Sequence, residues 1–164
     1  MIRLYHFTAR EYLRGIAAHG LTVGDVPLTL ETGTVGVWLT SSPDAHGHGL
    51  EGGYLEKRAI RLAVNVTESP PLVRWSEWAP TRVEPNFLDA LNSEGGSDSW
   101  YIFFGVIRPE RIVECFDLRS GVPIADWQRL PPSPDDLRGV PPHARERWRR
   151  ATLRKTLAFV RSRQ

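Results

Sequence analysis

Three short stretches of the chain carry side chains whose types could do chemistry together. The first contains His6, whose ring nitrogens can donate or accept hydrogen bonds. The second contains Trp38, which is followed by Tyr54, and the third begins at Asp98. Aromatic faces attract cations, and a carboxylate stabilises positive charge that develops during a reaction. Side chains of these types could together bind and stabilise a positively charged group.

Order and spacing give these stretches a resemblance to the ADP-ribosyltransferase superfamily. They resemble the branch with a histidine, an aromatic residue and an acid, which includes poly(ADP-ribose) polymerases and rifampicin ADP-ribosyltransferases. A His-x-Ser/Thr motif ends the first strand of that family, as His6-Phe7-Thr8 does here. Val37-Trp38-Leu39 matches the next motif, with Trp where Tyr is usual, and Tyr54 matches a second aromatic residue. Asp98, ahead of an apolar run, matches the usual Glu, and the resemblance covers about residues 2–118.

The resemblance implies an NAD-dependent mono-ADP-ribosyltransferase, which needs NAD as cosubstrate and no metal. The acceptor of ADP-ribose would be a protein, a nucleic acid or a small molecule. Asp98, or Glu94 as its rival, would hold the ribose 2′-hydroxyl and face the oxocarbenium-like charge. Trp38 and Tyr54 would stack on the nicotinamide ring with a cation–π attraction of roughly 0.5–2 kcal/mol. His6 would hydrogen-bond ribose hydroxyls. Three further polar residues would orient the pocket: Thr8, Thr40 and Ser41.

Two other functions remain open on the sequence. One is the related RNA 2′-phosphotransferase, which attaches ADP-ribose to a 2′-phosphate of RNA. The other is a catalytically degenerate transferase fold that acts as a binding or inhibitor module. The site residues also have structural interpretations: His6 as a core histidine bonded to the backbone, Trp38 as core, Tyr54 as a packed loop residue and Asp98 as a turn residue.

The charge of the chain is divided unevenly along its length. Residues 143–164 hold eight basic residues and one acidic residue, for a net charge of +7, and the other residues sum to −5. This basic segment either docks on the acidic body or contacts nucleic-acid phosphate. Four residues could contact a substrate: Trp75, Trp78, Arg145 and Arg149. Both tryptophans could equally cover the core.

The elements that would position these residues follow from hydrophobic patterning. We expect strands at residues 2–7, 35–40, 59–66, 100–107 and 111–118. We expect helices at residues 8–20, 86–92 and 144–162, the first with a capping box from Thr8 to Glu11 and a Gly20 C-terminus. Residues 69–85 are predicted as an irregular loop. The predicted fold is α+β, a mixed and split β-sheet sandwich of ADP-ribosyltransferase type with a basic C-terminal helix.

Composition sets the broad class of protein. The chain has 164 residues, of which 41% are hydrophobic, so it can form one packed domain. The predicted divisions are a catalytic domain at 1–122, a Pro-rich linker at 123–142 and a basic helix at 143–164. A single cysteine, Cys115, excludes an internal disulfide. We expect a cytoplasmic protein because no apolar stretch approaches membrane-spanning length. His46 and His48 lie on a glycine loop, which we interpret as a mobile loop without a metal.

Overall fold

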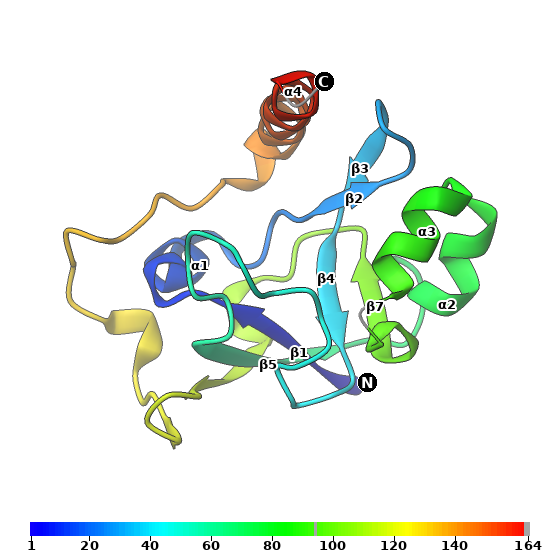
Figure 1. Cartoon of the computed structure of the whole chain (residues 1–164). Coiled ribbons are helices and arrows are strands. Elements are labelled where there is room, and N and C mark those ends of the chain that lie inside the picture. The colour runs from blue at the N-terminus through cyan, green and yellow to red at the C-terminus, as the bar shows by residue number, and fades with distance from the viewer. Residues whose placement is uncertain (94, 163–164) are drawn as a thin grey trace.

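The computed structural model describes residues 1–93 and 95–162, and it has the mixed α+β architecture that the sequence predicts. Seven strands form one antiparallel sheet in the order β6-β7-β4-β1-β5-β8-β9 (Figure 1). These strands are β1 (Ile2–Thr8), β4 (Val37–Thr40), β5 (Ile60–Val66), β6 (Leu72–Arg74), β7 (Trp100–Phe103), β8 (Ile112–Asp117) and β9 (Val122–Pro123). A separate hairpin joins β2 (Asp25–Pro27) to β3 (Gly33–Val35). The helices are α1 (Leu13–His19), α2 (Trp75–Trp78), α3 (Pro85–Asn92) and α4 (Arg145–Ser162).

The pairing of β1 with β5 forms the centre of the sheet. It runs over seven residue pairs, from Ile2 opposite Val66 to Thr8 opposite Ile60. Both strands were predicted, because β-branched and aliphatic residues suit a pleated and buried surface. The side chains of a strand alternate between the two faces of the sheet, so this register also fixes which face each side chain of β1 occupies.

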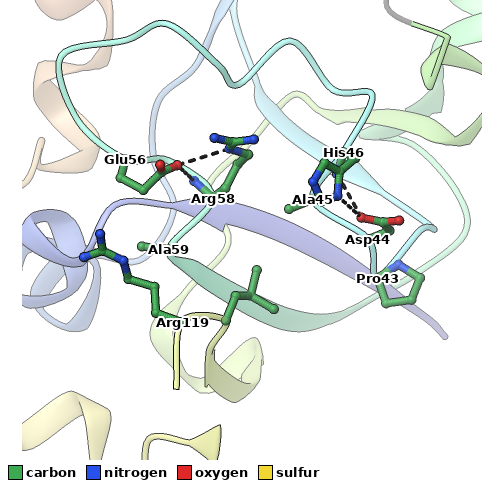
Figure 2. Close-up of a pocket in the computed structure, with 9 residues that line it drawn as sticks. Pro43, Asp44, Ala45, His46, Glu56, Arg58, Ala59 and Arg119 are labelled. Atoms are coloured by element: carbon green, nitrogen blue, oxygen red, sulfur yellow. Dashed lines mark hydrogen bonds and ion pairs between the residues drawn. The ribbon is translucent and has the colours of Figure 1, made fainter. Parts of the chain in front are cut away.

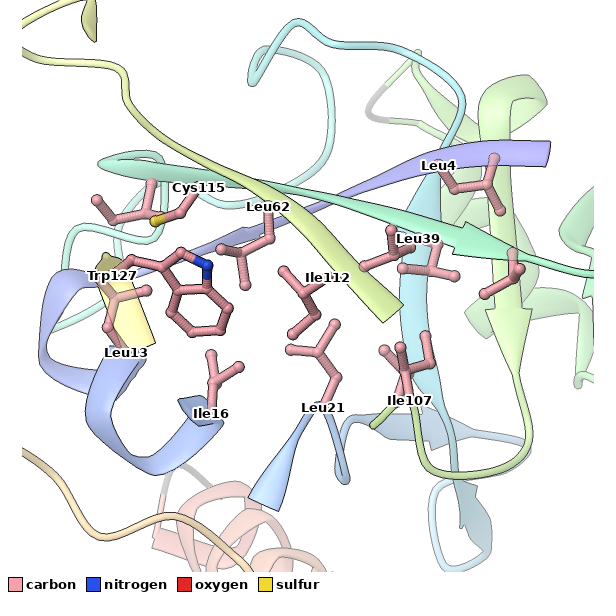
Figure 3. Close-up of a cluster of buried hydrophobic side chains, with 14 of the residues drawn as sticks. Leu4, Leu13, Ile16, Leu21, Leu39, Leu62, Ile107, Ile112, Cys115 and Trp127 are labelled. Atoms are coloured by element: carbon pink, nitrogen blue, oxygen red, sulfur yellow. The ribbon is translucent and has the colours of Figure 1, made fainter. Parts of the chain in front are cut away.

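One face of the sheet packs on α1 and carries the larger core. Leu13 and Ile16 of α1 belong to the same buried cluster as the strand residues Leu39 and Leu62 (Figure 3). Trp127, from the Pro-rich segment, is buried in the same cluster, so this segment contributes to the core. Burying one such aliphatic side chain stabilises the fold by roughly 1.5–3 kcal/mol.

The opposite face of the sheet packs on α2 and α3. Trp100 and Ile102 of β7 form the buried centre of this second cluster, together with Trp75 of α2. Neighbouring strand residues divide between the two clusters: Leu39 belongs to the α1 side and Trp38 to the α2 side. This alternation confirms that β4 and β7 are covered on both faces.

Several predicted boundaries differ from the structure. Residues 69–85 contain β6 and α2, so the prediction of an irregular loop there is wrong. The predicted capping box is also wrong, because Thr8 is the last residue of β1 and a 3-10 turn (Arg10–Tyr12) precedes α1 with no side-chain cap. Gly20 does end α1, with a φ of +80°. Gly36 separates β3 from β4, and a Cβ there would lie 2.5 Å from Ile102 Cγ2.

The Pro-rich segment runs along the body toward α4 (Figure 1). The backbone N–H of Leu137 donates to Glu11 O at 2.9 Å, and the Thr22 hydroxyl donates to Val140 O at 2.7 Å. These bonds hold the segment against the start of the chain. Within the described residues, no helix has the length and apolar character that crossing a membrane requires.

Candidate functional site

His6 lies on β1, and the backbone of β4 fixes its ring. His6 Nδ1 lies 2.9 Å from the carbonyl oxygen of Trp38. A carbonyl only accepts, so Nδ1 carries the proton and the neutral ring leaves Nε2 as an acceptor. Burial lowers the pKa of His6, the hydrogen bond to Trp38 raises it in part, and the positive charge of Lys57 lowers it further. The structure therefore favours a neutral His6 of defined tautomer.

The acceptor atom of His6 has no partner within the protein. No described residue donates to Nε2, and this atom is not among the fully buried, unpartnered side-chain atoms. Its lone pair is therefore available to a hydroxyl or N–H group of a ligand. This is the property that the predicted ribose contact requires.

The indole of Trp38 and the ring of His6 lie on opposite faces of the sheet. Tyr5 of β1 pairs with Thr40 of β4, so these two side chains share a face with Trp38. His6 follows Tyr5 and therefore lies on the opposite face, where it pairs with the core residue Leu62. The structure brings His6 to the main chain of Trp38 and separates the two side chains.

Trp38 anchors an aromatic cluster beneath α2. Its indole N–H donates to Asp25 O at 2.8 Å, and its ring centroid lies 5.0 Å from Trp75 and 5.7 Å from Trp100. Trp75 is 1% exposed, so in this structure it is a core residue and not a substrate platform. Trp78 is half-buried and packs on the Phe104 ring at 5.0 Å.

A chain of hydroxyl groups joins the end of β4 to the turn that carries Asp98. Ser99 Oγ donates to Gly96 O at 2.8 Å, so the 2.7 Å contact between the two hydroxyls has Thr40 as donor and Ser99 as acceptor. Thr40 Oγ1 accepts from Ser42 N, and Ser41 N donates to Ser99 O. This network fixes the 3-10 turn (Ser97–Ser99), in which Asp98 is exposed. The rival acid, Glu94, lies outside the described residues.

His48 belongs to the same region, although the sequence analysis gave it no part in the site. Its Nδ1 accepts a hydrogen bond from the indole N–H of Trp100 at 2.8 Å, and its Nε2 donates to Asp44 O at 2.9 Å. Its ring also stacks on Phe7, with the centroids 5.6 Å apart. His48 therefore attaches the 43–59 loop to the sheet. The sequence could indicate this role of His48 only through its position between two glycines, because its partner Trp100 is distant in sequence.

The rest of this loop departs from the predicted arrangement. Tyr54 is fully exposed, so the structure does not place its ring against Trp38. The backbone N–H of His46 donates to Asp44 Oδ1 at 3.0 Å, and His46 Nδ1 lies 2.7 Å from the same oxygen. These two hydrogen bonds lower the pKa of the Asp44 carboxyl. The two loop histidines thus have separate partners, and the described residues contain no group of three or more metal-binding side chains.

A hollow of about 370 Å³ lies between the two ends of this loop, residues 43–46 and 56–59, and residues 118–119 after β8 (Figure 2). Arg58 lies beside it and pairs with Glu56 and Glu51 at 3.2 and 3.3 Å. Arg119 also lines the hollow. None of the predicted NAD-binding residues is among its lining residues.

Arg145 and Arg149, proposed from the sequence as substrate contacts, face the body of the protein. Arg145 donates to Thr22 O at 2.6 Å and to Gly105 O at 3.1 Å. Arg149 is half-buried, and its Nε lacks a hydrogen-bond partner. Burial raises the pKa of Asp25, and the nearby charge of Arg149 offsets part of that rise. These two arginines hold the first turns of α4 against the body.

Comparison of the chain with protein-family models, with curated proteins and with solved structures found no match in any of the three. The function is therefore argued from the site itself. One part of the structure offers a neutral histidine with a free acceptor beside the charge of Lys57, and a separate turn offers the exposed Asp98 carboxylate.

Proposed function

We propose that the chain is an NAD-dependent ADP-ribosyltransferase whose sheet is of the ADP-ribosyltransferase type. The observation that carries this proposal is the neutral His6 ring, held by Trp38 O with Nε2 free. A lone pair fixed in direction on a central strand suits the recognition of a ribose hydroxyl. The order of His6, Trp38 and Asp98 in the chain supports the same assignment.

The proposed reaction breaks the bond between C1′ of the ribose and the nicotinamide nitrogen. The bonding electrons leave with neutral nicotinamide, and the acceptor nucleophile then bonds to C1′ and loses a proton. Nε2 of His6 accepts a hydrogen bond from a ribose hydroxyl, and the Asp98 carboxylate faces the positive charge on the ribose. The Lys57 ammonium lies close enough to affect His6 and suits the anionic diphosphate of NAD.

Trp38 takes a different role from the predicted nicotinamide stack. Its carbonyl orients His6, and its indole is held in the aromatic cluster on the other face. We therefore assign Trp38 as a positioning residue.

A second candidate function is a degenerate transferase fold that binds a partner without catalysis. The separation of the His6 and Trp38 side chains, together with the full exposure of Tyr54, favours this alternative. The two functions differ in whether NAD is consumed.

Nicotinamide release from NAD tests the proposal. The wild type is incubated with NAD, and free nicotinamide is quantified by liquid chromatography; binding of NAD is measured by calorimetry. We expect release by the wild type and at least a 100-fold slower rate in Asp98→Ala, because each transition-state contact of this kind contributes about 2.7–4 kcal/mol. Asp135→Ala, which changes another exposed aspartate, is the matched control and should leave the rate unchanged. A folded wild type that neither binds nor cleaves NAD would refute the proposal.

A further inference from the structure

The arginines of α4 fall on two opposite sides of the helix. With 3.6 residues per turn, Arg145 and Arg149 share one side, and both face the body. Arg147, Arg150 and Arg154 lie on the other side, at about 140° to 200° from Arg145 around the helix axis. The inward pair anchors the helix, so the outward three residues point away from the body. We call these three residues the outward face of α4.

The outward face presents charge that the protein does not neutralise. Arg147, Arg150 and Arg154 are all exposed. Within residues 1–93 and 95–162, no ion pair joins any of them to a carboxylate. Arg150 Nε donates to Glu146 O of its own helix at 3.4 Å, a contact that leaves its charge unpaired. Figure 1 shows α4 at the periphery of the molecule, beside the β2–β3 hairpin.

We propose that the outward face of α4 binds the phosphate backbone of double-stranded DNA. The three arginines extend over about 10 Å at a rise of 1.5 Å per residue. Duplex DNA carries about one charge per 1.7 Å of its axis, so several phosphates lie within that length. A helix with side chains is about 10–12 Å across and fits a major groove of about 12 Å, whereas the major groove of A-form RNA is deep and narrow.

The chemistry of the outward face argues against other nucleic acids. Proteins that bind single strands stack bases on exposed aromatic rings. Trp148, the aromatic residue of the first turns, lies on the inward side and is half-buried. Arginine guanidinium groups bind phosphate oxygens with two parallel hydrogen bonds, and the outward face holds three of them. The proposed contact is therefore with the phosphate backbone.

Salt dependence of binding to a labelled 20-base-pair DNA duplex tests this proposal. Fluorescence anisotropy is measured with the full chain at 50 and 200 mM salt, with no NAD present, so the result is independent of the proposed transferase activity. Three neutralised phosphates predict a slope of about −2.7 in log affinity against log salt, or about 40-fold weaker binding at the higher salt. The triple variant Arg147→Gln, Arg150→Gln, Arg154→Gln should lose this slope and bind at least tenfold more weakly at 50 mM salt.

Two further variants test whether DNA binding depends on the charge of the outward face or on the net charge of the whole protein. The matched control changes three exposed arginines elsewhere, Arg82→Gln, Arg108→Gln and Arg129→Gln, and should bind as the wild type does. Arg-to-Lys substitution of the outward face should keep the salt slope. The proposal is overturned if the outward triple variant, folded by circular dichroism, binds DNA as tightly as the control variant. It is also overturned if single-stranded RNA or phosphatidylserine vesicles bind the wild type more tightly than the duplex.

Discussion

Replacement of His6 by Asn separates the structural and the chemical roles of this histidine. The amide nitrogen of Asn occupies a position similar to Nδ1, so it can still donate to Trp38 O, and the Nε2 acceptor is lost. His6→Ala removes both groups and leaves a carbonyl without its donor, which costs about 1–3 kcal/mol when buried. We expect Asn to retain most of the stability that Ala loses.

The pH dependence of stability distinguishes His6→Asn from the wild type more clearly than stability at a single pH. The pKa of His6 is lowered in the folded protein, so the unfolded chain binds the proton more readily. The contribution of His6 to stability is therefore complete above about pH 6.5 and is lost as the pH falls below that value. The slope can reach at most about 1.4 kcal/mol per pH unit between the unfolded and folded pKa values.

Urea denaturation between pH 5 and pH 8 measures this effect. The wild type should lose stability below pH 6.5 more steeply than His6→Asn, and the two curves should run parallel above pH 7. The other four histidines are present in both proteins, so they cancel in the comparison. Identical pH profiles for the two proteins would show that the ring is not held neutral by its surroundings.

Three further predictions concern the core and the attachment of α4. Trp75→Ala should destabilise the fold by about 3–5 kcal/mol in urea denaturation, because the ring is almost fully buried, and Trp78→Ala should cost less; equal losses would contradict the difference in burial. Burial raises the pKa of Cys115 to about 12, so iodoacetamide at pH 8 should label the native thiol far more slowly than the urea-unfolded thiol, and equal labelling rates would contradict its burial. Arg145→Ala should increase proteolysis between Pro142 and α4, since it removes two hydrogen bonds to the body, and an unchanged cleavage pattern would contradict that anchoring role.

The sequence predicted the long elements of the fold better than the short ones. The seven residues of β5 alternate between apolar and polar positions except at Ala63, and α3 has a helical apolar pattern. β6 has three residues and α2 has four, too few for a period to be recognised in a segment rich in proline and tryptophan. The capping box failed because pairing with β5 keeps Thr8 in the strand.

The candidate site was harder to predict because it depends on register. The sequence correctly placed His6 on a first strand and Trp38 on a second one, but it could not show which face each side chain occupies. That information comes from the pairing of Tyr5 with Thr40, a contact between distant parts of the chain. The attachment of His48 to Trp100 is equally non-local. Local motifs identify such residues, and tertiary pairing decides their neighbours.

The central claim is that His6 and Asp98 act together on NAD, and nicotinamide release tests it most directly. The measurement compares the wild type, His6→Asn, Asp98→Ala and the control Asp135→Ala at pH 7.5, each shown to be folded. We expect steady release by the wild type and the control, and at least 100-fold slower release by the other two variants. Release that is absent from the folded wild type, or unchanged in His6→Asn and Asp98→Ala, would contradict the account.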